Sequence, residues 1–138
     1  MQHNMSFDNF RIRKMSFSVN DKFKPKKTPY DITPEISVGS EYRKKENDLT
    51  VFLKVFLNAG EVPFFFEVES ESVFSFKEEP DEKLIKQFSV MNCPAMVFPY
   101  VRETIADLTR RAGFPPLHLP PINFIELAKE KEAKTPPT

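Results

Sequence analysis

The sequence predicts an α+β fold in which helices cover one face of an antiparallel sheet. Several segments between residues 10 and 76 place apolar side chains at every second position, which is the period of a strand, whereas segments between residues 81 and 134 space them by three and four, which is the period of a helix. Strands that precede helices, rather than alternate with them, are typical of this class. We expect residues 1–138 to form a single domain, with residues 1–8 and 134–138 as flexible tails.

The clearest strand pattern lies at residues 49–58. One face is aliphatic throughout, and its members are Leu49, Val51, Leu53, Val55 and Leu57. The segment Ala59-Gly60-Glu61 is a turn signal, and a second long strand is predicted at residues 62–76. Two long strands joined by a short connection predict an antiparallel hairpin.

Two weaker strands are predicted upstream, at residues 10–19 and 35–46. In the first of them the apolar positions change parity between Ile12 and Met15, and a β-bulge would explain that change. Residues 22–34 contain three prolines, which lack the N–H that a ladder requires, so we expect an extended crossover loop there. The four strands together predict a four-stranded antiparallel sheet.

Proline positions decide where we expect the helices. Residues 81–90 predict a short helix that ends at Asn92-Cys93-Pro94. Because proline is tolerated in the first turn of a helix, the long helix is expected to begin near Pro99, with residues 95–98 as its lead-in. Gly113 is placed to cap its C-terminus.

A proline-rich connector at residues 114–121 leads to the last predicted helix. This helix covers residues 124–134 and carries Asn123 at its N-terminal capping position. Phe124 and Leu127 would share its buried side.

Composition excludes several classes of protein. With 20 basic and 20 acidic side chains the chain lacks the basic excess of a nucleic-acid binder. A single cysteine excludes a disulfide framework and a cysteine-rich zinc site, and it suits a reducing compartment. The chain has neither a signal-peptide layout nor an apolar run long enough for a membrane span. We expect a cytoplasmic protein that uses no metal or other cofactor and does not insert into membranes.

Catalysis is not indicated by any residue pattern. His3 lies in the expected N-terminal tail and His118 lies in the connector, so neither is paired with Cys93 in the sequence. Cys93 is interpreted as a small apolar residue just before a helix. The glycines stand far apart, which excludes a glycine-rich phosphate loop. We predict that the chain is not an enzyme, and the sequence assigns no role to Cys93 or His118.

The informative feature is apolar surface that one layer of helices leaves uncovered. Phe52, Phe56 and Phe65 are predicted on the face opposite the aliphatic row. Leaving several aromatic rings in water is costly, because burying each is worth roughly 1.5–3 kcal/mol. The rings therefore predict either a subunit interface or a surface kept for flexible apolar client chains, and the two can occur on different faces.

Charge is concentrated in the middle of the chain. Residues 61–98 carry 8 acidic and 3 basic side chains. This pattern is typical of a solvated strand edge and loop, or of a docking face for a basic partner.

A long composite motif then resembles a known family. The stretch at residues 92–105 contains Phe-Pro-Tyr-Val-Arg-Glu, and residues 111–124 contain Gly-Phe-Pro-Pro-Leu-His-Leu-Pro-Pro-Ile-Asn-Phe. This pattern resembles the SecB export chaperones, and Thr33-Pro34-Glu35-Ile36 and the segment at residues 66–68 fall in the same order.

The resemblance implies a fold and a function. The fold would be a four-stranded antiparallel sheet backed by helices, assembled as a homotetramer, a dimer of dimers. The function would be that of an ATP-independent chaperone that holds unfolded preproteins in apolar grooves and delivers them to the SecA motor. No cofactor is implied.

The resemblance also implies site residues. Those expected to line the client-binding groove are Ile32, Ile36, Val38, Phe64, Tyr100 and Leu117. Tyr100 and Leu117 can equally be packing residues of the helix and the connector. Phe65 and Glu67 match part of the surface that docks SecA in the family. Acidic positions of that surface on the first strand fall at Lys14 and Ser18 in this chain.

Two alternatives stay open at this point. SecB-like relatives also serve toxin–antitoxin systems, so the chain could be dedicated to a single partner such as an antitoxin. A small-molecule-binding or enzymatic α+β domain would instead show a deep, closed pocket.

Overall fold

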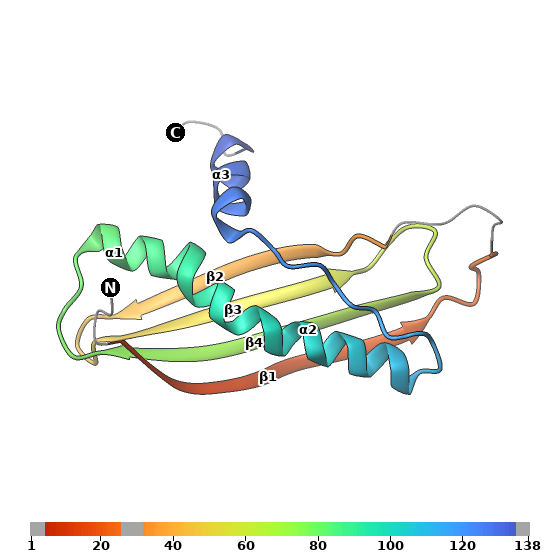
Figure 1. Cartoon of the computed structure of the whole chain (residues 1–138), viewed down its shortest axis with the longest axis horizontal. Helices are drawn as coiled ribbons and strands as arrows, with labels where there is room; N and C mark the ends of the chain where they lie inside the picture. The colour runs from red at the N-terminus through yellow and green to blue at the C-terminus, as the bar shows by residue number, and fades with distance from the viewer. Residues whose placement is uncertain (1–4, 26–31, 135–138) are drawn as a thin grey trace.

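In the part of the chain that the structure describes, four strands form one antiparallel sheet in the spatial order β1-β4-β3-β2 (Figure 1). The computed structural model describes residues 5–25 and 32–134, with side chains described up to residue 130. The strands are β1 (Met5–Val19), β2 (Glu35–Arg43), β3 (Asp48–Leu57) and β4 (Phe64–Phe76). The crossover between β1 and β2 therefore joins the two opposite edges of the sheet. The predicted hairpin of the third and fourth strands is confirmed.

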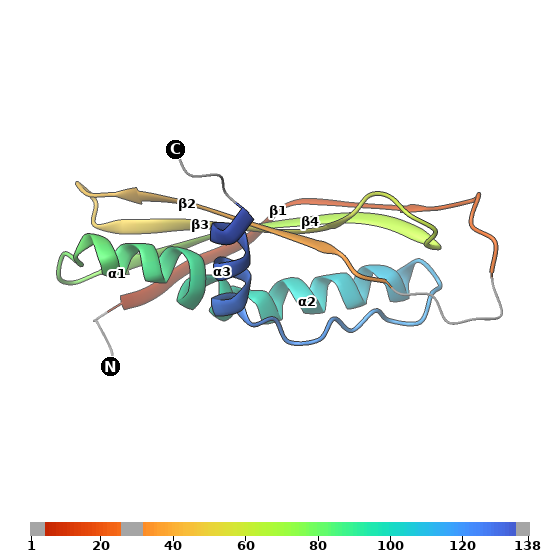
Figure 2. The same ribbon diagram turned by 90° about the horizontal axis from the view of Figure 1, so that it is seen from above.

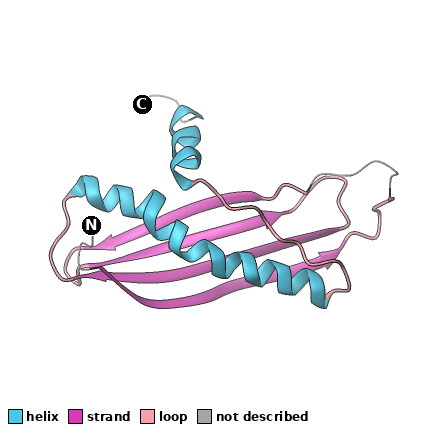
Figure 3. Ribbon diagram, in the orientation of Figure 1, coloured by secondary structure: helices cyan, strands magenta, loops and turns pink. Residues whose placement is uncertain are grey.

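The helices follow the strands in the chain, and the first two of them run along one face of the sheet (Figures 2 and 3). They are α1 (Glu82–Gln87), the π-helical turn η1 (Phe88–Asn92), α2 (Cys93–Arg111) and α3 (Phe124–Lys134). The helix α2 crosses the sheet diagonally, and α3 projects beyond the β2 edge (Figure 1). The predicted α+β class is confirmed.

Alternate residues of β3 and β4 form the core beneath α2. All the odd-numbered residues of β3 from Leu49 to Leu57 are buried, as the sequence predicted. The even-numbered residues of β4 are buried as well, among them Phe64, Val68 and Phe74. From α2, Val97, Val101 and Ile105 pack onto them without measurable exposure. This face of the sheet is called the inner face, and the opposite one the outer face.

The strand β1 is longer and more irregular than the sequence predicted. It begins at Met5 rather than at residue 10, so residues 5–8 belong to a strand and not to a flexible tail. Its pairing with β4 shifts twice, between Phe7 and Asn9 and between Ile12 and Lys14. The second shift confirms the predicted bulge. Because of it, Ile12 pairs with an inner-face residue while Lys14 pairs with an outer-face one.

The predicted boundary between the first two helices is wrong. The chain does not break at Asn92-Cys93-Pro94 but continues through η1 directly into α2, which begins at Cys93. In η1 the Cys93 N–H donates to the Phe88 carbonyl, five residues back, and this wider turn leads into Pro94. Pro99 lies inside α2 rather than at its start, because buried residues on both sides of it, such as Val97 and Val101, hold the helix against the sheet.

The helix ends follow local capping chemistry. Gly113 has φ of 93°, and its N–H donates to the Arg110 carbonyl at 3.1 Å, which confirms the predicted cap of α2. At α3, the Asn123 Oδ1 accepts hydrogen bonds from the N–H groups of Ile125 and Glu126, each at 3.1 Å. Both caps were predicted from residue type alone.

Residues 1–4, 26–31 and 135–138 lie outside the described part of the chain, so part of the predicted crossover loop and of both predicted tails is not tested. Within the described residues, no helix combines the length and the apolar character needed to span a bilayer.

Candidate functional site

The outer face of the sheet carries a row of glutamates on β4. Glu67, Glu69 and Glu71 alternate with buried residues, and their side chains are 19%, 25% and 22% exposed. Phe65 precedes them on the same face and is half-buried. The structure thus brings Phe65 and Glu67, the two predicted docking residues, onto one surface.

Cations from the two neighbouring strands pair with these carboxylates. The Arg11 Nε donates to the Glu71 Oε2 at 2.6 Å, and the Arg13 Nε lies 3.6 Å from the Glu69 Oε2. Glu67 is paired on both sides, with the Lys14 ammonium on β1 and with the Lys54 ammonium on β3, whose Nζ lies 2.9 Å from the Glu67 Oε1. Hydrogen bonds from Lys14 and then Lys54 hold the pKa of the Glu67 carboxyl below its ordinary value.

The phenylalanines of β3 on this face are covered by cations. The Arg13 guanidinium lies 5.1 Å from the centre of the Phe52 ring, and the Lys54 ammonium lies 4.7 Å from the centre of the Phe56 ring. Both rings are half-buried. Cation–π contacts at such exposed sites contribute on the order of 0.5–1 kcal/mol each. The outer face of this chain is therefore a mosaic of paired charges and covered rings rather than a bare acidic or apolar surface.

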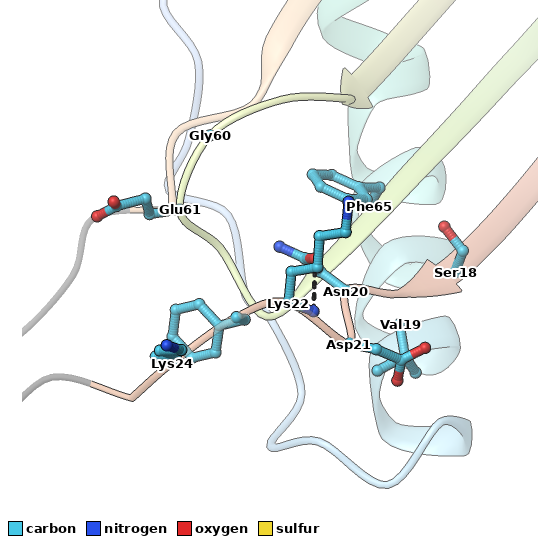
Figure 4. A pocket seen from close by; sticks show the side chains of 10 residues that line it. Ser18, Val19, Asn20, Asp21, Lys22, Lys24, Gly60, Glu61 and Phe65 are labelled. Carbon is cyan, nitrogen blue, oxygen red and sulfur yellow. Dashed lines mark hydrogen bonds between the residues drawn. The ribbon is translucent and has the colours of Figure 1, made fainter.

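A hollow of about 790 Å³ opens where β1 ends beside the β3–β4 loop (Figure 4). Its wall includes Phe65, Gly60, Glu61 and residues 18–24. Asn20 shapes it, because its Nδ2 donates to the Val62 carbonyl at 2.8 Å while its Oδ1 accepts from the Lys22 N–H at 3.2 Å. A smaller hollow of about 270 Å³ shares Ser18 and Phe65 with it and reaches Glu67.

The predicted groove residues lie on the helix-covered side. Tyr100 is 50% exposed on α2, and its ring lies 5.2 Å from that of Phe10 and 6.3 Å from that of Phe7, both on β1. Its ring therefore packs over the N-terminal half of β1 and still presents half of its surface.

Phe64, in contrast, is 3% exposed. Its ring lies 5.0 Å from that of Phe114 and 5.3 Å from that of Phe17. The connector that begins at Phe114 covers it, so the ring is closed to a client in this conformation. Leu117, further along the connector, is half-buried, and its N–H donates to the Thr109 hydroxyl at 2.9 Å.

Ile32, Ile36 and Val38 are half-buried at the other edge of the sheet. Ile36 and Val38 lie on the inner face of β2, opposite Val55 and Leu53. Since β4 and β3 separate β1 from β2, and neighbouring strands lie roughly 4.8 Å apart, the Tyr100 side and the β2 side are on the order of 14 Å apart. The structure does not bring the six predicted residues together at one point.

The two side chains without an assigned role are also placed. Cys93 is fully buried, with its Sγ 3.9 Å from the Met5 Sδ, and burial raises the pKa of its thiol to about 12. Its full burial agrees with the interpretation of Cys93 as a small apolar packing residue. His118 is exposed beside a shallow hollow of about 370 Å³ that Glu103 and Asp107 also line. Among the described residues, no cluster of His, Cys, Asp or Glu is arranged to hold a metal ion.

Comparison with protein families decides the relationship. A model of the family described as SecB, preprotein translocase subunit SecB, matches residues 1–135. The chain belongs to the SecB family. A protein-export protein SecB of Dinoroseobacter shibae is 32% identical over 135 residues, which cover 94% of this chain and 73% of that protein. The protein-export protein SecB of Nitrobacter winogradskyi is 38% identical over 109 residues, which cover 77% of this chain and 67% of that protein.

Solved structures agree with the SecB fold. A SecB-like chaperone of Mycobacterium tuberculosis, in complex with a ChAD peptide from the HigA1 antitoxin, superposes with a TM-score of 0.66 at 20% identity, over 87% of this chain and 91% of that one. A protein of unknown function from Streptococcus agalactiae superposes with a TM-score of 0.54 at 13% identity, over 84% of this chain and 96% of that one. The predicted family, and with it the assignment to protein-export chaperones, is confirmed.

Some contacts of this SecB chain were missed by the sequence reasoning. The cations Arg13 and Lys54 were not recognised as partners of the outer face, although Lys14 stood out as a departure from the family. The period of two in a strand puts Lys54 on the outer face with Phe52 and Phe56, so the sequence alone could have predicted its position on that face. That Lys14 reaches the same carboxylate follows from the β1 register, which two bulges set.

Proposed function

We propose that this chain is an ATP-independent chaperone that holds unfolded preproteins in the cytoplasm and hands them to the SecA motor for export. The observation that carries the proposal is membership of the SecB family together with apolar side chains left open on the helix side. Among the side chains that the structure describes, the large hydrophobic ones with about half of their surface exposed are Met15, Val19, Met96, Tyr100 and Ile125. Such side chains suit extended, apolar client segments.

The client surface is proposed to run along both borders of α2. On the β1 side it includes Tyr100, and on the β2 side it includes Ile32, Ile36 and Val38. Leu117 and Phe64 would join this surface only if the connector at residues 114–121 moved away, because Phe114 covers Phe64 in this structure. Phe65 and Glu67 are proposed as the surface for SecA. We further propose a homotetramer built as a dimer of dimers.

An aggregation assay tests the holding activity. A reduced client protein that unfolds and scatters light should stay clear when this protein is present at one tetramer per client, and full scattering would contradict the proposal. Tyr100→Asp should weaken suppression several-fold, because a carboxylate replaces an exposed apolar ring. Gln87→Glu adds a similar charge at an exposed position of α1 and should leave suppression unchanged. Light scattering of the protein alone measures the oligomer.

A chaperone dedicated to one partner, such as an antitoxin, is the second candidate. The similarity to the Mycobacterium tuberculosis SecB-like chaperone, whose structure holds an antitoxin peptide, is the observation that favours it. Assays with several unrelated unfolded clients separate the two functions. Suppression of aggregation for all of them supports the general holdase, whereas suppression for a single client, with no binding to SecA, supports the dedicated chaperone.

A further inference from the structure

We infer that Lys14 and Lys54 are specificity-determining residues that occupy Glu67 from within the chain and so weaken the docking of a cationic partner on the outer face. The inference rests on the proposed function in one respect, because Glu67 belongs to the surface proposed for SecA. The geometry that carries it is independent of any partner.

The two lysines reach Glu67 from opposite sides. Glu67 lies on β4, one of the two inner strands, so it has a neighbouring strand on each side, and each neighbour contributes one ammonium group. On the β1 side, the bulge at Arg13 turns Lys14 outward, and without it Lys14 would share the inner face with Ile12. The β1 irregularity therefore has a direct electrostatic consequence.

The two lysines also restrict access to the Glu67 carboxylate. The Glu67 side chain is 19% exposed, whereas the side chains of Lys14 and Lys54 are 60% and 36% exposed. The lysines lie further out than the group they pair with. A cationic segment that approaches this face meets ammonium groups before it meets the carboxylate.

A cationic partner has to compete with the two lysines for Glu67. Each Glu67 oxygen already has an ammonium partner, one from Lys14 and one from Lys54. These partners are tethered to adjacent strands, so their effective concentration at Glu67 exceeds that of a partner in solution. A docking lysine must displace one of them, and the exchange of one exposed ion pair for another yields little free energy.

The same arrangement extends along β4. Arg13 lies beside Glu69, and Arg11 donates to Glu71. The row that composition marks as acidic is thus neutralised by β1, and Lys14 and Lys54 complete the neutralisation at the end nearest Phe65.

A binding experiment tests the inference. The probe is a short, labelled, unstructured peptide of alternating lysine and glycine, and its affinity is measured by fluorescence anisotropy at low ionic strength. Lys14→Gln with Lys54→Gln should bind it on the order of threefold to tenfold more tightly than the unchanged protein. The gain should shrink in about 0.5 M salt, which screens exposed charges.

A charge-matched control isolates the position of the lysines. Lys44→Gln with Lys45→Gln removes the same two charges from the exposed turn between β2 and β3, at the other end of the sheet. It should change the affinity less than twofold. Adding Glu67→Gln to the Lys14 and Lys54 variant should abolish the gain.

Two results would overturn the inference: an unchanged affinity in the Lys14 and Lys54 variant, or an equal gain in the control. Thermal unfolding checks that each variant is folded. The aggregation assay separates this inference from the proposed function. If the Lys14 and Lys54 variant gains peptide binding but no form of the protein suppresses aggregation, the inference is supported and the proposed function is contradicted. If the protein suppresses aggregation but the variant gains no peptide binding, the proposed function is supported and the inference is contradicted.

Discussion

The two faces of the same strands are built on different physical principles. On β3 the inner-face residues Leu49, Val51, Leu53 and Val55 have no measurable exposure, and they lie beneath α2. The outer-face residues that alternate with them, such as Phe52, Lys54 and Phe56, are half-buried, and cations cover both rings. The inner face is held by burial, which is non-directional and large, whereas the outer face is held by ion pairs and cation–π contacts, which are small and adjustable. The outer face can therefore vary without loss of the fold.

The largest expected effect compares the two faces directly. Leu53→Ala removes a fully buried side chain and should lower the free energy of unfolding by about 2–5 kcal/mol. Phe52→Ala, one residue away, should cost about 1 kcal/mol, because its ring lies over Gly39 and beneath Arg13 but remains partly in water. Urea unfolding of both variants measures the difference. Equal losses would contradict the distinction and would show that the outer face is buried in solution by another chain.

The second prediction concerns how the inner face is closed. The Thr109 hydroxyl is buried, donates to the Ile105 carbonyl at 3.0 Å and accepts from the Leu117 N–H at 2.9 Å. Thr109→Val keeps the shape but leaves that N–H without its acceptor, so it should lower the free energy of unfolding by about 1–3 kcal/mol. It should also speed hydrogen exchange at the Leu117 amide, because the connector loses its anchor to α2.

Thr104→Val is the matched control for this prediction. Its hydroxyl donates to the Tyr100 carbonyl at 2.9 Å on the more exposed side of the helix, so the loss should stay below about 0.5 kcal/mol. If both variants lose the same stability, or if exchange at Leu117 does not change, Thr109 is not the anchor of the connector.

The difference between the faces also explains what the sequence could predict. The inner rows of β3 and β4 follow a strict period of two, so the hairpin and its buried side were predictable from residues 49–58 and 62–76 alone. The caps at Gly113 and Asn123 were predictable because they are local. The start of α2 was not, since Pro99 is unfavourable inside a helix and the helix is held there by its packing on the sheet.

The candidate site was less predictable, because its contacts join distant segments. Parity placed Phe65 and Glu67 on one face correctly, and the same parity put Phe64 on the opposite face, where a connector some fifty residues later covers it. No local pattern reveals that cover. The pairing of Lys14 with Glu67 depends on two bulges in β1, because a register shift of one residue would place Lys14 on the inner face.

The third prediction asks whether ion pairs on the outer face contribute to stability. Asp48 accepts from the Arg43 Nε at 2.8 Å and is the one charged residue that is buried among the described residues. Hydrogen bonding to Arg43 lowers the pKa of the Asp48 carboxyl from its ordinary 3.8. The unfolded chain then binds the proton more readily, so this contribution is present above pH 3.8 and is lost as the pH falls through the lowered value.

Asp48→Asn should therefore cost about 1 kcal/mol at neutral pH and flatten the acid limb of the stability profile. Urea unfolding between neutral pH and about pH 3 measures both quantities. Arg43→Lys keeps the charge but loses the bidentate contact with Asp48, so its stability should lie between that of the unchanged protein and that of Asp48→Asn. Parallel profiles for all three would show that the pair contributes nothing.

The smallest expected effect is a gain in stability, and it concerns a buried hydroxyl on the inner face that has no hydrogen-bond partner in the described part of the chain. Ser72 lies on the buried row of β4, and its Oγ finds no hydrogen-bond partner among the described residues. Ser72→Ala should raise the free energy of unfolding by about 0.5–1 kcal/mol, because it removes a buried hydroxyl that loses its water partners on folding. Ser70→Ala, two residues away, removes a hydroxyl that donates weakly to the Leu53 carbonyl at 3.4 Å and should be close to neutral. A loss of stability in Ser72→Ala would mean that a bound water or a second chain satisfies the hydroxyl, and the inner face would then not be closed by burial alone.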